Sequence, residues 1–190
     1  MSEAAGGNRR GLILLLCGLA IFVVTAIVLA AMGQPWIAPD GTIRLWDSGA
    51  GTSLHLLDWY ALSHIIHGFL FYLLLWLVAR RQSLGVRALI AMVIEAGWEI
   101  LENTPWVIDR YRDVTVSGDY VGDTVLNSTS DLAAMLVGFY LAARLPVWVT
   151  VVLAIVLELV AAWVIRDNLT LNVIMLVYPI DGILAWQSGG

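Results

Sequence analysis

Long runs of apolar residues, separated by short polar stretches, dominate the pattern along the chain. A helix rises about 1.5 Å per residue, so about 20 apolar residues are needed to cross about 30 Å of hydrocarbon. Four runs have this length or nearly so, and a fifth is shorter and starts with polar residues. The sequence therefore predicts an all-α, multi-pass transmembrane helix bundle with five spans: 11–33, 61–80, 86–104, 129–144 and 146–166.

The tail at 171–186 is also apolar, but Tyr178, Pro179 and Asp181 interrupt it. Proline breaks a helix because it lacks a backbone donor and clashes with the preceding turn. Three interpretations stay open for this segment: a re-entrant piece, an interfacial helix or a short or broken sixth span. No linker or internal repeat divides the chain, so residues 1–190 are expected to form a single integral membrane domain.

Composition supports the membrane interpretation. Apolar residues make up 60% of the 190 and charged residues 13%, whereas soluble domains are nearer half and a quarter. A chain this short has too little interior to hide so much apolar surface. The composition excludes a disordered chain, a basic nucleic-acid binder and a disulfide-stapled secreted domain. Membrane lipids are the expected partners, and a homo-oligomer or a complex with other membrane proteins is left open.

Arginine positions predict the orientation, because short positively charged loops stay in the cytoplasm. The chain has a net charge of −5, and all its basic residues are arginines. With the N-terminus inside, six arginines lie in short cytoplasmic stretches and four lie in longer outer loops. We expect a cytoplasmic N-terminus: Arg9, Arg10, Arg80, Arg81, Arg87 and Arg144 lie inside, and Arg44, Arg110, Arg112 and Arg166 outside.

Ionisable residues inside the spans gather at one depth. His64 and His67 share a face of the second span, because residues three apart are neighbours on a helix. Glu95, Glu99 and Glu102 form a stripe on the third span. Three carboxylates one turn apart repel one another if all are charged, so a proton, a cation or an arginine must neutralise at least one. Each such residue costs energy in a membrane, which makes it a functional candidate.

The second outer loop, 105–128, adds further polar residues. Arg110 and Arg112 point the same way if this stretch is extended, toward the carboxylates or an anionic head group. Asp123, Asn127 and Asp131 lead into the fourth span. The loop also carries many apolar residues, so we expect it to fold over the site as a cap.

Together these residues suit two kinds of metal site. Histidine with carboxylate favours zinc, manganese or iron, whereas an all-oxygen set favours calcium or magnesium. No H-E-x-x-H or G-x-S-x-G motif is present, nor a glycine-rich phosphate loop. The predicted roles are a divalent metal site at His64, His67, Glu102 and Asp131, catalysis by Glu95, Glu99 and Asp123, and substrate binding by Arg110, Arg112 and Asn127.

Three functions are compatible with this cluster. The leading hypothesis is metal-assisted hydrolysis or transfer on a lipid or lipid-linked substrate at the periplasmic side, in which a metal lowers the pKa of a water and Glu95 or Glu99 relays protons. A non-enzymatic scaffold or assembly protein, whose cluster only joins helices, is a close rival. A proton-coupled transporter ranks behind both, because the third span is apolar inward of Glu95.

The stretches 63–68, 98–105 and 111–131 resemble a family of small inner-membrane proteins from alphaproteobacteria. That family is catalogued as an uncharacterised protein family, so the resemblance implies a multi-pass cell-membrane protein and no activity. The spacing of Asp123, Asn127 and Asp131, followed by Gly138, resembles more weakly the D-x-x-x-N-x-x-G pattern of VanZ-like membrane proteins.

Overall fold

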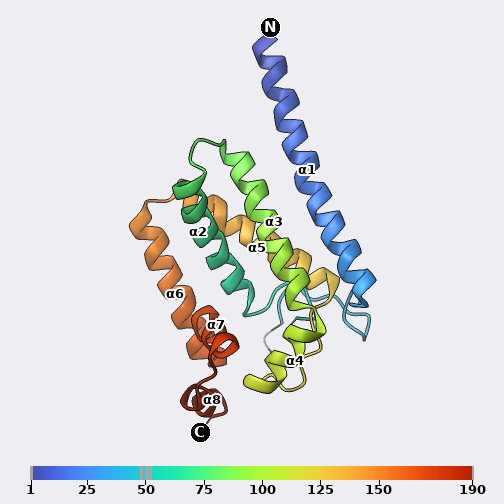
Figure 1. Cartoon of the computed structure of the whole chain (residues 1–190), viewed down its shortest axis with the longest axis vertical. Helices are drawn as coiled ribbons and strands as arrows, with labels where there is room; N and C mark the ends of the chain where they lie inside the picture. Colours follow the sequence, from blue (N-terminus) through green and yellow to red (C-terminus); the bar gives the residue numbers. More distant parts are fainter. Residues whose placement is uncertain (1, 48, 50–52, 190) are drawn as a thin grey trace.

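The chain folds into eight helices (Figure 1) in the computed structural model, which describes residues 2–47, 49 and 53–189. No strand occurs among these residues, although a β-bridge joins Trp46 to Leu57. The predicted all-α fold is therefore confirmed. The helices are α1 (Ser2–Met32), α2 (Ala61–Val78), α3 (Leu84–Glu102), α4 (Pro105–Val114), α5 (Val125–Arg144), α6 (Val147–Ile165), α7 (Leu169–Val177) and α8 (Asp181–Gln187).

Four of these helices, α1, α2, α5 and α6, are long and apolar enough to cross a membrane by length and composition. α3 has 19 residues but also Arg87 and the three glutamates. It packs against α1, α2 and α5; Arg87 lies over the ring of Tyr72 on α2, and Glu95 and Glu99 face His64 of α2. The four apolar helices are those of a multi-pass membrane protein.

The helix α5 begins four residues before the expected start at position 129. Thr124 caps it by accepting a hydrogen bond from the backbone N–H of Asn127. The backbone N–H groups of Val125 and Leu126 donate to the carbonyls of Pro35 and Trp36, which follow α1. Because these contacts satisfy the donors that a helix start leaves free, the polar turn at 125–128 becomes helical.

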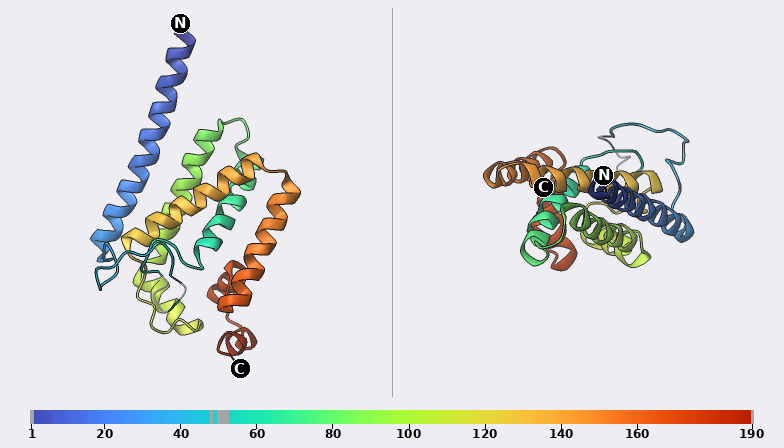
Figure 2. Two further views of the ribbon diagram at one scale, coloured as in Figure 1. Left: turned by 180° about the vertical axis from the view of Figure 1, so that it is seen from behind. Right: turned by 90° about the horizontal axis from the view of Figure 1, so that it is seen from above.

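The closest contact in the bundle is the crossing of α2 and α5. A Cβ atom on Gly68 would collide with the backbone of Met135 and Phe139, and one on Gly138 with the backbone of Ile65. Glycine thus lets the two backbones touch, as small residues do in membrane helix pairs. Seen from behind, α5 runs obliquely across the other helices (Figure 2).

An apolar core surrounds this crossing. It is made by α2, α3 and α5, and includes Leu132, Met135 and Phe139, each with 0% exposure. The remaining members are Leu75, Ala88, Ala91 and Met92. Its members on α2 and α3 lie between the α2–α3 loop and the histidines and glutamates, so the polar residues of these two helices lie toward the other end.

The outer loop at 105–128 begins with a helix, α4. Thr104 precedes it and Pro105 takes its first turn, a position where proline costs no hydrogen bond. Its buried residues Val107, Ile108, Tyr111 and Val114 follow the helical period. The expectation that Arg110 and Arg112 point the same way is therefore wrong, because residues two apart on a helix face different sides.

The tail forms two short helices, α7 and α8, of 9 and 7 residues, so no continuous sixth span forms there. Glu158 of α6 caps α7 by accepting backbone N–H bonds from Leu169 and Thr170. Asp167 accepts hydrogen bonds from Gln187 of α8 and from the hydroxyl of Tyr60. Burial raises the pKa of the Asp167 carboxyl. These bonds hold the tail against the start of α2.

Candidate functional site

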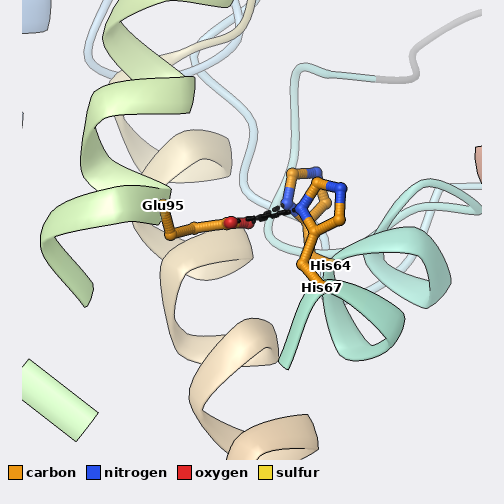
Figure 3. Close-up of side chains that lie close together, drawn as sticks. All are labelled: His64, His67 and Glu95. Carbon is orange, nitrogen blue, oxygen red and sulfur yellow. Dashed lines mark hydrogen bonds and ion pairs between the residues drawn. The ribbon is translucent and has the colours of Figure 1, made fainter. Parts of the chain in front are cut away.

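His64 and His67 on α2 both turn toward one carboxylate, that of Glu95 on α3 (Figure 3). Nδ1 of His64 lies 2.6 Å from Oε1 of Glu95. Nδ1 of His67 lies 3.0 Å from the same oxygen and 3.1 Å from Oε2. Glu95 has 0% exposure. The predicted meeting of the two imidazoles with the glutamate stripe is confirmed in this pair of helices.

A second group shares His64 and reaches α5. Nδ1 of His64 lies 3.5 Å from Oε1 of Glu99, and Nε2 lies 3.9 Å from Oδ2 of Asp131. Glu99 has 0% and Asp131 3% exposure. Within the described residues, both oxygens of Glu99 lack a hydrogen-bond partner, and so does Oδ1 of Asp131. A buried carboxylate without a partner is costly, so this group calls for a cation or a proton.

The glycine crossing of α2 and α5 brings His64 close to Asp131. His64 lies one turn before Gly68, and Asp131 lies one turn before Met135, whose carbonyl faces Gly68. Both side chains therefore stand one turn beyond the point where the backbones touch. Among the residues that the structure describes, two groups could hold a metal: His64–His67–Glu95 and His64–Glu99–Asp131.

A cavity of about 470 Å³ adjoins the two groups. His64, His67 and Asp131 line it, whereas Glu95 and Glu99 lie behind the wall. Residues of α4, α7 and the loop before α5 complete the lining, among them Tyr111, Asn172 and Tyr120. The loop at 105–128 thus covers the site, as its apolar content predicts.

The segment at 105–128 is called the cover below. Asp123 joins this cover to the end of α3 through hydrogen bonds. Its backbone N–H donates to Oδ1 of Asn103 at 2.7 Å, and its Oδ2 accepts from Nδ2 of Asn103 at 3.1 Å. The Tyr120 hydroxyl donates to its Oδ1 at 3.1 Å. Gly122 has a φ of +93°, and a Cβ there would lie 2.7 Å from Oδ1 of Asn103. A glycine is therefore required beside this bond.

Burial dominates the electrostatics of the cover. It raises the pKa of the Asp123 carboxyl, and hydrogen bonds from Ser53, Asn103 and Tyr120 offset part of that rise. Burial also raises the pKa of the Tyr111 and Tyr120 hydroxyls well above their usual range, and the nearby carboxylates add to this. Both tyrosines therefore stay protonated at neutral pH, and their hydroxyls donate to side chains of the cavity wall, Tyr111 to Asn172 and Tyr120 to Asp123.

Several predicted site residues lie outside the two groups. Glu102, Asp123 and Asn127 line the cavity, and Nδ2 of Asn127 donates to the carbonyl of His55. Arg110 donates to the carbonyl of Leu176, and Arg112 to that of Tyr120. The two arginines thus bond to backbone carbonyls, one on α7 and one within the loop at 105–128, and they do not line the cavity.

Sequence reasoning gave no role to the aromatic lining or to Asn103. Tyr60, Trp98, Tyr111 and Tyr120 line the cavity from four separate segments. Nothing in the sequence brings these segments together. Asn103 follows Glu102 directly. Its place at the end of the glutamate stripe could have identified it as a residue of the site.

Comparison with known proteins places this architecture in a family. The model of a family described as "Protein of unknown function (DUF2585)" matches residues 29–189. A UPF0314 protein from Sinorhizobium fredii is 52% identical, with all of both chains aligned. The chain belongs to this family. UPF0314 proteins from Paracoccus denitrificans and Novosphingobium aromaticivorans are 49% and 47% identical, over 89% and 96% of this chain and 91% and 100% of theirs.

The family match confirms the resemblance to uncharacterised alphaproteobacterial membrane proteins. No solved structure matches the chain. The similarity extends over nearly the full length, so the helices that build the His/Glu/Asp groups fall within the region shared with the relatives.

Proposed function

We propose that this UPF0314 family member is a membrane enzyme that binds a divalent metal and performs hydrolysis or group transfer on a lipid or lipid-linked substrate. One observation carries the proposal. Glu99 is fully buried beside His64 and Asp131, and in the described part of the chain both its oxygens lack a hydrogen-bond partner. A bound cation would neutralise this carboxylate and complete the group.

The donor chemistry fits such an ion. In the group His64–Glu99–Asp131, one imidazole with carboxylates from α3 and α5 forms a mixed set that suits zinc, manganese or iron, and His67 belongs to the adjoining group with Glu95. The Glu95 carboxylate orients both imidazoles through their Nδ1 atoms. Partners of this kind fix the orientation of metal-binding histidines.

The cavity assigns different tasks to the carboxylates. His64, Glu99 and Asp131 would hold the metal, which when bound would supply Lewis-acid polarisation of the bond to be cleaved. Asp131 lines the cavity and has a free Oδ1, so it can take a proton from a nucleophile there. Glu95 does not line the cavity and acts by positioning the histidines. The geometry thus favours acid–base work by Asp131 over the earlier expectation of Glu95.

The apolar core argues against a transporter. A transport path requires polar groups on both sides of the site, but Leu75 of α2 and Ala91 and Met92 of α3, which lie between the site and the α2–α3 loop, are buried apolar core residues. A scaffold remains the rival function, because the hydrogen bonds of His64 and His67 to Glu95 join α2 to α3 without an ion.

Metal content separates the enzyme from the scaffold. We expect protein purified in a neutral detergent to carry a stoichiometric transition metal in elemental analysis. His64→Ala and Glu99→Gln should lower the metal content about tenfold or more, because each removes a ligand while the helices remain packed. His55→Ala is the matched control: His55 is buried at 4% exposure and pairs with Asp47 in the first outer loop.

The proposal is supported if His55→Ala keeps its metal while His64→Ala and Glu99→Gln lose theirs. Folded wild-type protein without a metal would contradict it. In that case the cluster serves to join the helices, as a scaffold requires.

The site is proposed to face the periplasm, with the N-terminus of an inner-membrane protein in the cytoplasm. The α2–α3 loop carries Arg80 and Arg81 and lies at the bundle end opposite α4 (Figure 1). A reporter fused after Arg81 should behave as cytoplasmic, and one inserted near Gly118 as periplasmic. The reverse pattern would place the cavity on the cytoplasmic side.

A further inference from the structure

The cavity is acidic. Glu102, Asp119, Asp123 and Asp131 line it, and the only basic side chains on its described wall are His64 and His67. Arg110 and Arg112 bond to backbone carbonyls instead. Asp131 has 3% exposure, faces the cavity and has an Oδ1 without a partner among the residues described. Such a lining offers carboxylate oxygens to a cationic group and no arginine to an anionic head group.

The cavity is also aromatic. Tyr60, Phe71, Trp98, Tyr111 and Tyr120 line it, and the rings of Tyr111 and Tyr120 meet edge to face with centroids 5.3 Å apart. Aromatic faces attract organic cations, and cages of such rings combined with carboxylates recognise quaternary ammonium groups. The combination therefore fits a compact positive head group better than a polyol or a phosphate.

The lining residues Phe71, Ile94 and Val173 make up an apolar arm of the cavity. Phe71 lies ten residues after the start of α2, or about 15 Å along the helix, and Ile94 lies on α3 next to Glu95. Ile94 is 39% exposed and Val173 of α7 is 49% exposed, although both line the cavity. The arm is thus open on its side, toward the lipid that surrounds the spans.

We propose that the substrate is an amphiphile with a cationic amine or quaternary ammonium head group, which enters from the bilayer between α2 and α3. The head group lies among the carboxylates and tyrosines beside His64, and the chain lies along Phe71 and Ile94. This inference deepens the proposed function, because it takes the cavity as the substrate compartment of that enzyme.

Two photoreactive probes test the inference. Both have a dodecyl chain with a terminal diazirine, one with a trimethylammonium head and the other with a sulfate head. In neutral maltoside micelles, the cationic probe should label the segments around Phe71 and Ile94 about tenfold more than the anionic probe. One cation–π contact together with charge attraction is sufficient for a ratio of this size. Unlabelled dodecyltrimethylammonium should compete for this labelling.

Matched variants assign the preference to the cavity. Trp98→Ala and Glu102→Gln should each reduce the preference, because these residues line the cavity. Trp106→Ala and Asp113→Asn should not, because Trp106 is 73% exposed on α4, Asp113 is exposed, and neither lines the cavity. Equal labelling by both probes, or labelling that Trp98→Ala and Glu102→Gln leave unchanged, would overturn the inference.

Metal analysis of the same samples keeps the two proposals apart. A metal-loaded protein without preference for the cationic probe would overturn the inference and leave the metal enzyme. A metal-free protein that still prefers the cationic probe would support the inference and contradict the metal enzyme. If the Trp98→Ala protein keeps its metal but loses the preference for the cationic probe, both the metal enzyme and the inference are supported.

Discussion

Replacing Gly138 with leucine is expected to prevent the bundle from assembling. The position of its Cβ is occupied by the backbone of Ile65 on α2, and a backbone cannot move aside as a flexible side chain can. Overpacking a well-packed core costs about 1–3 kcal/mol, and separating two touching backbones costs more. Gly138→Ala should already lower the thermal midpoint in detergent, and Gly138→Leu should leave little monodisperse protein.

Gly97 on α3 provides the control for this prediction. A Cβ there meets no atom within 4 Å, so Gly97→Ala and Gly97→Leu should leave the midpoint nearly unchanged. Because His64 and Asp131 stand one turn beyond the crossing, any Gly138→Ala protein that folds should also bind less metal. A normal midpoint for Gly138→Leu would show that α2 and α5 do not touch at this point.

Removing the Asp123 carboxylate is expected to open the cover of the cavity. Asp123→Ala deletes the acceptor of the Tyr120 hydroxyl and of Nδ2 of Asn103. Hydrogen bonds to charged groups contribute about 1.5–3 kcal/mol, so local opening should become about tenfold to a hundredfold more frequent. Limited trypsin digestion of spheroplasts should then cut at Arg110 and Arg112 of the variant, whereas the wild type should resist cleavage.

Asp113→Ala is the matched control for the cover. Asp113 is an exposed carboxylate on α4, close to both cleavage sites, so its loss changes the local charge without removing a bond of Asp123. This variant should resist trypsin as the wild type does. Rapid cleavage of the wild type would show that α4 is not held against the bundle.

The cluster itself was largely predictable from periodicity. His64 with His67 and Glu95 with Glu99 share helix faces at spacings of three and four residues, and ionisable groups in apolar helices must find partners. Antiparallel neighbours then bring them to one depth. The same reasoning did not separate Glu95, which both imidazoles bind, from Glu102, which lines the cavity instead.

The cover was predicted only in outline. Its apolar residues indicated that it packs on the bundle, but its arginines were expected to face the site. Pro105 starts a helix there, and the helical turn directs Arg110 to the carbonyl of Leu176. The partner lies 66 residues further along the chain, and no local pattern could identify it.

The sequence by itself determined the all-α class, the apolar helices and the facing of the histidines and glutamates, because these depend on hydrophobicity and on the period of one helix. Only the tertiary structure decided which groups meet. The contact of Gly68 and Gly138 sets the register of α2 against α5, and with it the distance from His64 to Asp131. Such contacts depend on the rotation and crossing of helices, which arise from the packing of all elements together.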